Sequence, residues 1–255
     1  MPGPSSEQPE AARQRVAGDA DRAAEPVAPA AVGTLAVRAM QRQLERIYEV
    51  DTGLDVTDFL VTDVQVARQL DKQQARATTE ETLYVMQEDD DLHLSLFLAE
   101  RLVKDLGRDN PIDTLHAGNL SGYCTALEGV SHFVYVAHNA RYSRAVSLLE
   151  LELQAEIDKY VSSVFLLGRQ GLGRVPRGMV DALFGAPEFD DSLDSTQRAR
   201  YEQANRYAER YCSQLERRFL SGGKAGLLNE LRRFYRLTQR QKISHIESRQ
   251  NQIRH

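Results

Sequence analysis

The sequence predicts an α+β protein that is mainly α-helical, with one β-hairpin followed by a helical bundle centred on an antiparallel helix pair. Three observations predict this class. The runs TLYVMQ and LHLSLFL, on either side of an acidic tip, have the branched and aromatic composition of strands. Residues 115–139 and 146–168 are apolar around most of their circumference at about 100° per residue, which is typical of interior helices. Residues 1–33 hold five of the eight prolines among polar residues, which predicts a disordered N-terminal tail.

The first folded elements are expected to be short. Thr34 can cap a helix that runs to residue 50, and a second short helix follows Asp63 and ends near residue 70. The hairpin occupies about residues 81–98, with its turn at 88–91. Because an isolated hairpin is marginally stable in water, it must pack on a helix, another strand or a second subunit. We therefore expect self-association, most simply a homodimer.

The remainder is expected to be helical. A short helix from residue 99 to 106 precedes the two long apolar segments, which are joined by a few residues and so should form an αα-hairpin. A short helix over 176–183 and two basic helices, 196–220 and 224–247, complete the chain. We divide the sequence into a tail (1–33), a mixed domain (34–187) and a basic helical C-terminal segment (188–255) packed on the same domain.

Composition excludes several classes of protein. The 255 residues are 42% hydrophobic and 27% charged, which suits a globular core. The sequence contains no run of eighteen apolar residues, so we expect no membrane association. The two cysteines, Cys124 and Cys212, show no disulfide or CxxC spacing, and the N-terminus shows no secretory signal. The expected location is the cytoplasm.

Charge is segregated along the chain. Residues 196–255 contain 14 Lys and Arg but 5 Asp and Glu, whereas the rest contains 18 and 32, so a net charge of −5 combines +9 with −14. Arginine forks bind phosphates and carboxylates, so this segment could recognise an acidic protein surface or a nucleic acid such as RNA. Alternatively, it docks on the acidic part of the same chain or of a second copy. The candidate partner-binding residues are Arg206, Arg210, Arg217, Arg218, Arg232, Arg233, Arg236 and Arg240.

A candidate metal site lies in the αα-hairpin. Glu128 and His132 share one helix face by their i, i+4 spacing, and Glu152 and Glu156 share a face of the facing helix. Carboxylate and imidazole suit a divalent metal such as iron, manganese or zinc, and helix bundles build such sites from inward side chains. Ferritin-like proteins use Glu-x-x-His twice, whereas here Glu-x-x-x-His occurs once. The alternative is a structural polar network around His132, or pairing of the two glutamates with Lys159.

A glycine- and arginine-rich loop at residues 168–178 is a third candidate site. Glycines let backbone amides approach an anion, and arginine binds phosphate. The loop lacks the preceding strand and the Gly-Lys-Ser/Thr ending of a P-loop, and a mobile connector is the competing interpretation. The candidate ligand-binding residues are Arg169, Gly171, Gly173, Arg174 and Arg177.

Three functional hypotheses follow. The first is a binding or regulatory protein that recognises an acidic partner through its C-terminal helices. The second, from another class, is a metal-dependent enzyme, and the third is a phosphate-ligand-binding protein. No nucleophile motif, Rossmann fingerprint, zinc-knuckle spacing or kinase motif is present, and the sequence resembles no known family.

Overall fold

The computed structural model describes residues 28–70, 80–89, 91–171, 173, 178–187, 193–220 and 226–253. This part of the chain is mainly helical with one small sheet, as predicted. The helices are α1 (Pro29–Tyr48), α2 (Val64–Leu70), α3 (Glu100–Arg108), α4 (Ala117–Ala140), α5 (Leu148–Gln170), α6 (Met179–Phe184), α7 (Ser195–Leu215), α8 (Leu227–Tyr235) and α9 (Gln239–Ile253), with a 3-10 turn η1 (Val56–Phe59) and a π-helical turn η2 (Glu216–Leu220). The strands are β1 (Leu60–Val61), β2 (Glu81–Glu88) and β3 (Asp91–Leu98). Within these ranges, no helix is both long and apolar enough to cross a membrane.

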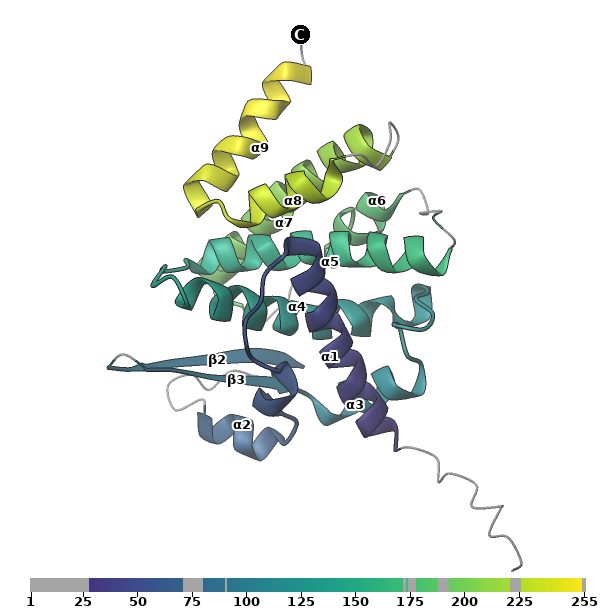
Figure 1. Cartoon of the computed structure of the whole chain (residues 1–255), viewed down its shortest axis with the longest axis vertical. Coiled ribbons are helices and arrows are strands. Elements are labelled where there is room, and N and C mark those ends of the chain that lie inside the picture. Colours follow the sequence, from purple (N-terminus) through teal and green to yellow (C-terminus); the bar gives the residue numbers. More distant parts are fainter. Residues whose placement is uncertain are drawn as a thin grey trace, which may run out of the picture.

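Helices α4 and α5 run side by side across the middle of the molecule (Figure 1). The hairpin of β2 and β3 packs on α4, and α7 packs on α5 from the other side. Helix α1 crosses the central pair and contacts α3 at one end and α8 at the other (Figure 1). The central helices are therefore covered by the β2–β3 hairpin, by α1 and by α7 of the C-terminal segment.

Helix α1 begins at Pro29, so the expected start at Thr34 was wrong. Proline fits the first turn of a helix, where its missing N–H has no intrahelical acceptor. Two glycines explain why this turn is ordered: a Cβ on Gly33 would lie 1.8 Å from the Val103 carbonyl oxygen, and one on Gly107 would lie 1.7 Å from the Pro29 carbonyl oxygen. The backbones of α1 and α3 thus meet where neither has a side chain. Residues 1–27 of the expected tail lie outside the described residues.

The predicted hairpin is confirmed, and it has the sheet partner that the sequence did not reveal. Strands β2 and β3 pair antiparallel from Glu81↔Leu98 to Glu88↔Asp91. The two-residue strand β1 pairs parallel with β3 through Leu60↔Leu96, which gives the strand order β1-β3-β2. Strand β2 is left at the edge, so self-association through the hairpin stays a prediction.

The central αα-hairpin is also confirmed. His116 caps α4 by accepting from the Gly118 amide, and Ser147 caps α5 by accepting from the Glu150 amide. Apolar residues on the facing sides of α4 and α5 form the centre of the core. The buried ones include Tyr123, Leu127, Val130, Phe133, Val134, Leu153, Ile157 and Val161.

The C-terminal segment departs from prediction at one point. The expected single helix over 224–247 is two helices, α8 and α9, so that prediction was wrong. Thr238 starts α9 as a reciprocal cap: its amide donates to Gln241 Oε1, and the Gln241 amide donates to Thr238 Oγ1. The Thr-x-x-Gln spacing of a capping box was the signal that could have placed this break.

Candidate metal centre

The αα-hairpin brings three of the four predicted metal ligands together. Glu128, His132 and Glu152 each offer one ligand atom, and these atoms all lie within 4.8 Å of one another. His132 Nε2 lies 3.4 Å from Glu152 Oε2, across the interface of α4 and α5. The antiparallel register expected from the short connection between the helices therefore produces the predicted contact.

The fourth predicted ligand, Glu156, lies beside a lysine instead. Lys159 Nζ donates to Glu156 Oε1 at 2.8 Å and lies 2.7 Å from Glu128 Oε2 on α4. The pairing with Lys159 was the alternative for Glu156, but the three side chains are largely buried and not at the surface. Glu128 consequently belongs both to the group of three and to the lysine pair.

Sequence reasoning missed Glu81, the first residue of β2. Its Oε1 lies 3.8 Å from His132 Nδ1, so the imidazole has a carboxylate near each nitrogen. Gly129 on α4 makes room for it, because a Cβ there would lie 2.7 Å from Glu81 Cγ. No local pattern connects Glu81 with His132, which lies 51 positions further along the chain, and the glycine beside Glu128 was the trace of the approach.

A basic residue of α7 completes the cluster. Arg200 Nε lies 3.9 Å from Glu152 Oε1, too far for a hydrogen bond. We call the set Glu81, Glu128, His132, Glu152, Glu156, Lys159 and Arg200 the His132 cluster. It draws on β2, α4, α5 and α7, so it forms only when the sheet and the C-terminal segment both pack on the central helices.

Unpaired polar atoms are concentrated in the His132 cluster. Seven buried side-chain atoms among the described residues have no hydrogen-bond partner, and three of them belong to this cluster: Glu81 Oε1, His132 Nε2 and Arg200 Nε. Although Glu152 is near, the geometry at His132 Nε2 does not make a hydrogen bond. Each of the three atoms lies within ion-pair distance of an oppositely charged group but makes no hydrogen bond, so the hydrogen-bonding capacity of the cluster is incompletely used.

Burial and charge act in opposite directions on the His132 cluster. Burial disfavours the charged imidazole, but Glu152 and Glu81 outweigh it and raise the pKa of His132 well above its ordinary value. Burial raises the pKa of Glu81. The pKa of Glu128 is lowered despite burial, because Lys159 and His132 stabilise its carboxylate. Glu128, the carboxylate shared with the lysine, is therefore held in its charged form.

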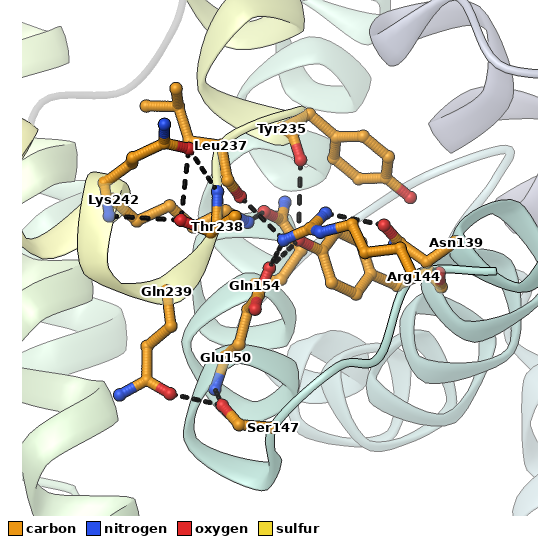
Figure 2. Close-up of polar contacts among 12 residues, drawn as sticks. Asn139, Arg144, Ser147, Glu150, Gln154, Tyr235, Leu237, Thr238, Gln239 and Lys242 are labelled. Atoms are coloured by element: carbon orange, nitrogen blue, oxygen red, sulfur yellow. Dashed lines mark hydrogen bonds and ion pairs between the residues drawn. The ribbon is translucent and has the colours of Figure 1, made fainter. Parts of the chain in front are cut away.

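A second buried network is built on α5 around Glu150, Gln154 and Asp158, and Figure 2 shows part of it. Asp158 accepts hydrogen bonds from Tyr48 OH, from Ser131 Oγ at 2.6 Å and from Gln154 Nε2 at 2.7 Å. The Lys242 ammonium of α9 donates to the Gln154 side-chain oxygen, as Figure 2 shows. We call this set, together with Tyr135, Arg144 and Glu150, the Lys242 network.

Every member of the Lys242 network has a partner. Glu150 accepts from Tyr135 OH at 2.6 Å and from Arg144, and Arg144 also donates to the Leu237 carbonyl oxygen at 3.0 Å (Figure 2). None of the network's buried side-chain polar atoms is unpaired. The sequence analysis did not single out this network, although its acceptors Glu150, Gln154 and Asp158 recur at four-residue steps along α5.

Lys242 itself is fully buried among aromatic rings. Its Nζ lies 4.5 Å from the ring centre of Tyr135 and 5.2 Å from that of Phe234. Burial lowers the pKa of Lys242 to about 7, against the opposing influence of Glu150 and Asp158. Burial likewise raises the pKa of Asp158 to about 6.

The eight candidate partner-binding arginines do not form one surface. Arg232 donates to the Ile47 carbonyl oxygen at 3.2 Å, and Arg236 donates to that of Tyr48 at 3.1 Å. These two arginines therefore dock α8 on the C-terminal end of α1, as one alternative expected. Arg210 lies over the Tyr207 ring, and Arg218 lies over the Phe219 ring. The remaining four are exposed and form no ion pair with another described residue: Arg206, Arg217, Arg233 and Arg240.

The glycine- and arginine-rich loop is only partly described. Arg169 donates to the Ile112 carbonyl oxygen at 3.0 Å. The amides of Gly171 and Gly173 donate to the carbonyl oxygens of Leu167 and Gly168, which end α5. Arg174 and Arg177 lie outside the described residues, so the phosphate site stays a prediction.

Comparison of the chain with protein-family models, with curated proteins and with solved structures gave no significant match.

Proposed function

We propose that this protein binds a divalent transition-metal ion between α4 and α5, through Glu128, His132 and Glu152, with Glu81 beside the other imidazole nitrogen as a residue that orients the ring. The observation that carries the proposal is the unpaired His132 Nε2. His132 is 6% exposed, and its Nε2 lies among carboxylate oxygens without forming a hydrogen bond. A metal ion held with Glu128 and Glu152 would satisfy this nitrogen.

Charge supports the same assignment. The His132 cluster contains four carboxylates and two permanent cations, so it carries a net charge of −1 with a charged imidazole and of −2 once the imidazole gives up its proton. A histidine ligand must be neutral to coordinate a metal, and a divalent ion then balances the cluster. Isolated buried charge costs several kcal/mol per ion in real proteins, so this balance matters.

The donor set points to the class of metal. One imidazole nitrogen and several carboxylate oxygens suit manganese, iron or zinc, whereas no thiolate is present to favour softer ions. When bound, such an ion supplies Lewis-acid or, for iron and manganese, redox chemistry. The chain's own residues orient the donors, and the apolar core around them limits access of water.

Metal analysis tests the proposal. Untagged protein is stripped with a chelator, dialysed against Mn²⁺ or Zn²⁺, and analysed for bound metal per chain. We expect retention by the parent protein and a loss of affinity of at least about 100-fold in His132→Ala, because removal of supporting residues alone typically costs 10–100-fold. The matched control is Glu202→Gln, an exposed carboxylate on α7. Failure of the parent to retain either metal, or equal retention by His132→Ala, would contradict the proposal.

A second candidate function rests on the four exposed arginines without ion pairs. They support recognition of an acidic macromolecule by the C-terminal helices, as the charge segregation predicts. A quadruple Arg→Gln variant at these positions should abolish salt-sensitive binding to single-stranded RNA or to an acidic polypeptide. A matched variant at Arg101 and Arg108 on α3 should not. Binding that does not weaken as the salt concentration rises, or that persists in the quadruple variant, would contradict this second candidate function.

Two further expectations belong with the proposal. Cys124 and Cys212 are both unpaired, which supports a reducing compartment such as the cytoplasm. The edge position of β2 supports self-association.

A further inference from the structure

Lys159 holds an unusual position within the His132 cluster. Its ammonium lies between one carboxylate from each central helix, 2.7 Å from Glu128 Oε2 and 2.8 Å from Glu156 Oε1. Both distances are those of charge-assisted hydrogen bonds. The Lys159 side chain is 15% exposed, and its two partners are similarly buried. The contact is therefore an interior ion pair across the helix interface.

The carboxylates divide into two halves that share Glu128. In the first half, Glu128 lies with His132 and Glu152, and the unpaired atoms are found there. In the second half, Glu128 lies with Glu156, and no unpaired atom is found on either residue. Each half pairs Glu128 of α4 with one glutamate of α5, which is Glu152 in the first half and Glu156 in the second. Because Glu128 belongs to both halves, the cluster could hold two neighbouring cations. In the second half, the cation is the lysine.

Two contacts keep the Lys159 ammonium between Glu128 and Glu156, where it competes with a metal ion for these carboxylates. The ammonium lies at hydrogen-bond distance from both carboxylates, one on each central helix, and these contacts fix its position. It is also tethered three residues from Glu156 on the same helix, so its effective concentration at the carboxylates is high.

We propose that Lys159 acts as a built-in cation that fills the Glu128/Glu156 half of the cluster and limits the protein to one metal ion per chain. This inference rests on the proposed metal binding. It deepens that proposal, because it makes the centre mononuclear and excludes chemistry that needs two adjacent ions. It also predicts that one substitution converts the centre to a dinuclear one.

The experiment compares metal stoichiometry in three chains. Parent protein, Lys159→Met and Lys159→Arg are dialysed against excess Mn²⁺, and bound manganese per chain is measured together with the electron paramagnetic resonance spectrum. Methionine removes the charge at similar length, whereas arginine keeps it. We expect one ion for the parent and for Lys159→Arg, and two ions with an exchange-coupled spectrum for Lys159→Met.

The outcomes separate this inference from the proposed function. No metal on the parent overturns the proposed metal binding. Two ions on the parent, or one ion on Lys159→Met, overturn the role of Lys159 and leave the metal site standing. Lys159→Gln repeats the test with a polar side chain if the methionine variant does not fold. If neither variant folds even when produced with Mn²⁺ present, the inference also fails, because a second divalent ion should replace the lost charge.

Discussion

The two sides of α5 bury polar groups in opposite ways. On one side, the Lys242 network pairs each of its buried polar atoms with another residue of the chain. On the other side, three buried atoms of the His132 cluster have charged neighbours but no hydrogen bond. Both sides use carboxylates and a lysine in the same apolar core. The Lys242 network links the start of α9 and α1 to α5, whereas the His132 cluster has the open hydrogen-bonding positions that the proposed metal site requires.

Removal of Asp158 should give the largest effect on stability. Asp158→Ala leaves three buried donors without their acceptor, on Tyr48, Ser131 and Gln154. We expect the free energy of unfolding to fall by about 3–5 kcal/mol, as for other broken buried polar networks. Urea denaturation measures it. Asp158→Asn, which keeps an acceptor, should cost less. A loss under about 1 kcal/mol for the alanine variant would show that the network is not a structural one.

The Lys242 network should also make stability depend on pH. Lys242 loses its proton above about pH 7 when folded, but keeps it to a much higher pH when unfolded. The unfolded state therefore binds more protons above pH 7, and stability should rise with pH there by up to about 1.4 kcal/mol per unit. The charged groups that face Lys242 are Glu150, Asp158 and Arg144.

Lys242→Met isolates this effect. It fills the same space without a titratable group, so the rise above pH 7 should disappear while the chain stays folded. Unfolding curves at a series of pH values from 6 to 9 give the slope. The same slope in Lys242→Met and in the parent would assign the pH dependence to another group.

On the other side of α5, Glu81→Gln should affect metal binding more than folding. Its Oε1 has no hydrogen-bond partner, so the amide loses none in the metal-free protein. We expect the free energy of unfolding to fall by about 1 kcal/mol, because His132 loses one carboxylate neighbour, and the affinity for Mn²⁺ to fall about tenfold. Calorimetric titration and urea denaturation on the same samples measure the two. A large loss in the free energy of unfolding with an unchanged affinity for Mn²⁺ would show that Glu81 has a structural role and does not support a metal site.

Arg200→Met should give the smallest change. Arg200 lies 3.9 Å from Glu152 without a hydrogen bond, so its loss should alter the free energy of unfolding by no more than about 0.5 kcal/mol. The substitution removes the Arg200 charge, which competes with a metal ion for Glu152, so the affinity for Mn²⁺ should rise severalfold. A fall in affinity would mean that Arg200 positions a ligand and does not compete with one.

Local patterns predicted much of the fold and part of the site. The apolar helices and their short connection placed Glu128, His132 and Glu152 together, because helical spacing and antiparallel packing follow from the chain alone. The polar residues of α5 at every second position, from Glu150 to Asp158, carried a further signal. A step of two residues turns a helix by about 200°, so they must form stripes on opposite faces, and a helix buried on both sides must bury both stripes.

Partners distant in sequence could not be predicted in this way. Glu81 reaches His132 only because β2 packs on α4 at Gly129, and Lys242 reaches Gln154 only because the start of α9 lies beside α5. The short strand β1 was missed for the same reason, since two residues carry no periodicity.

The sequence by itself determined the helical class, the hairpin, the central helix pair and the two polar stripes, because each follows from residue periodicity over a few turns. Only the tertiary structure decided which of the two stripes has all its buried polar atoms hydrogen-bonded. That outcome depends on which side chains from β2, α1, α7 and α9 arrive at each face of α5, and on whether their donors and acceptors match. Hydrogen bonds have strict requirements of distance and direction, and the packing of distant elements sets both.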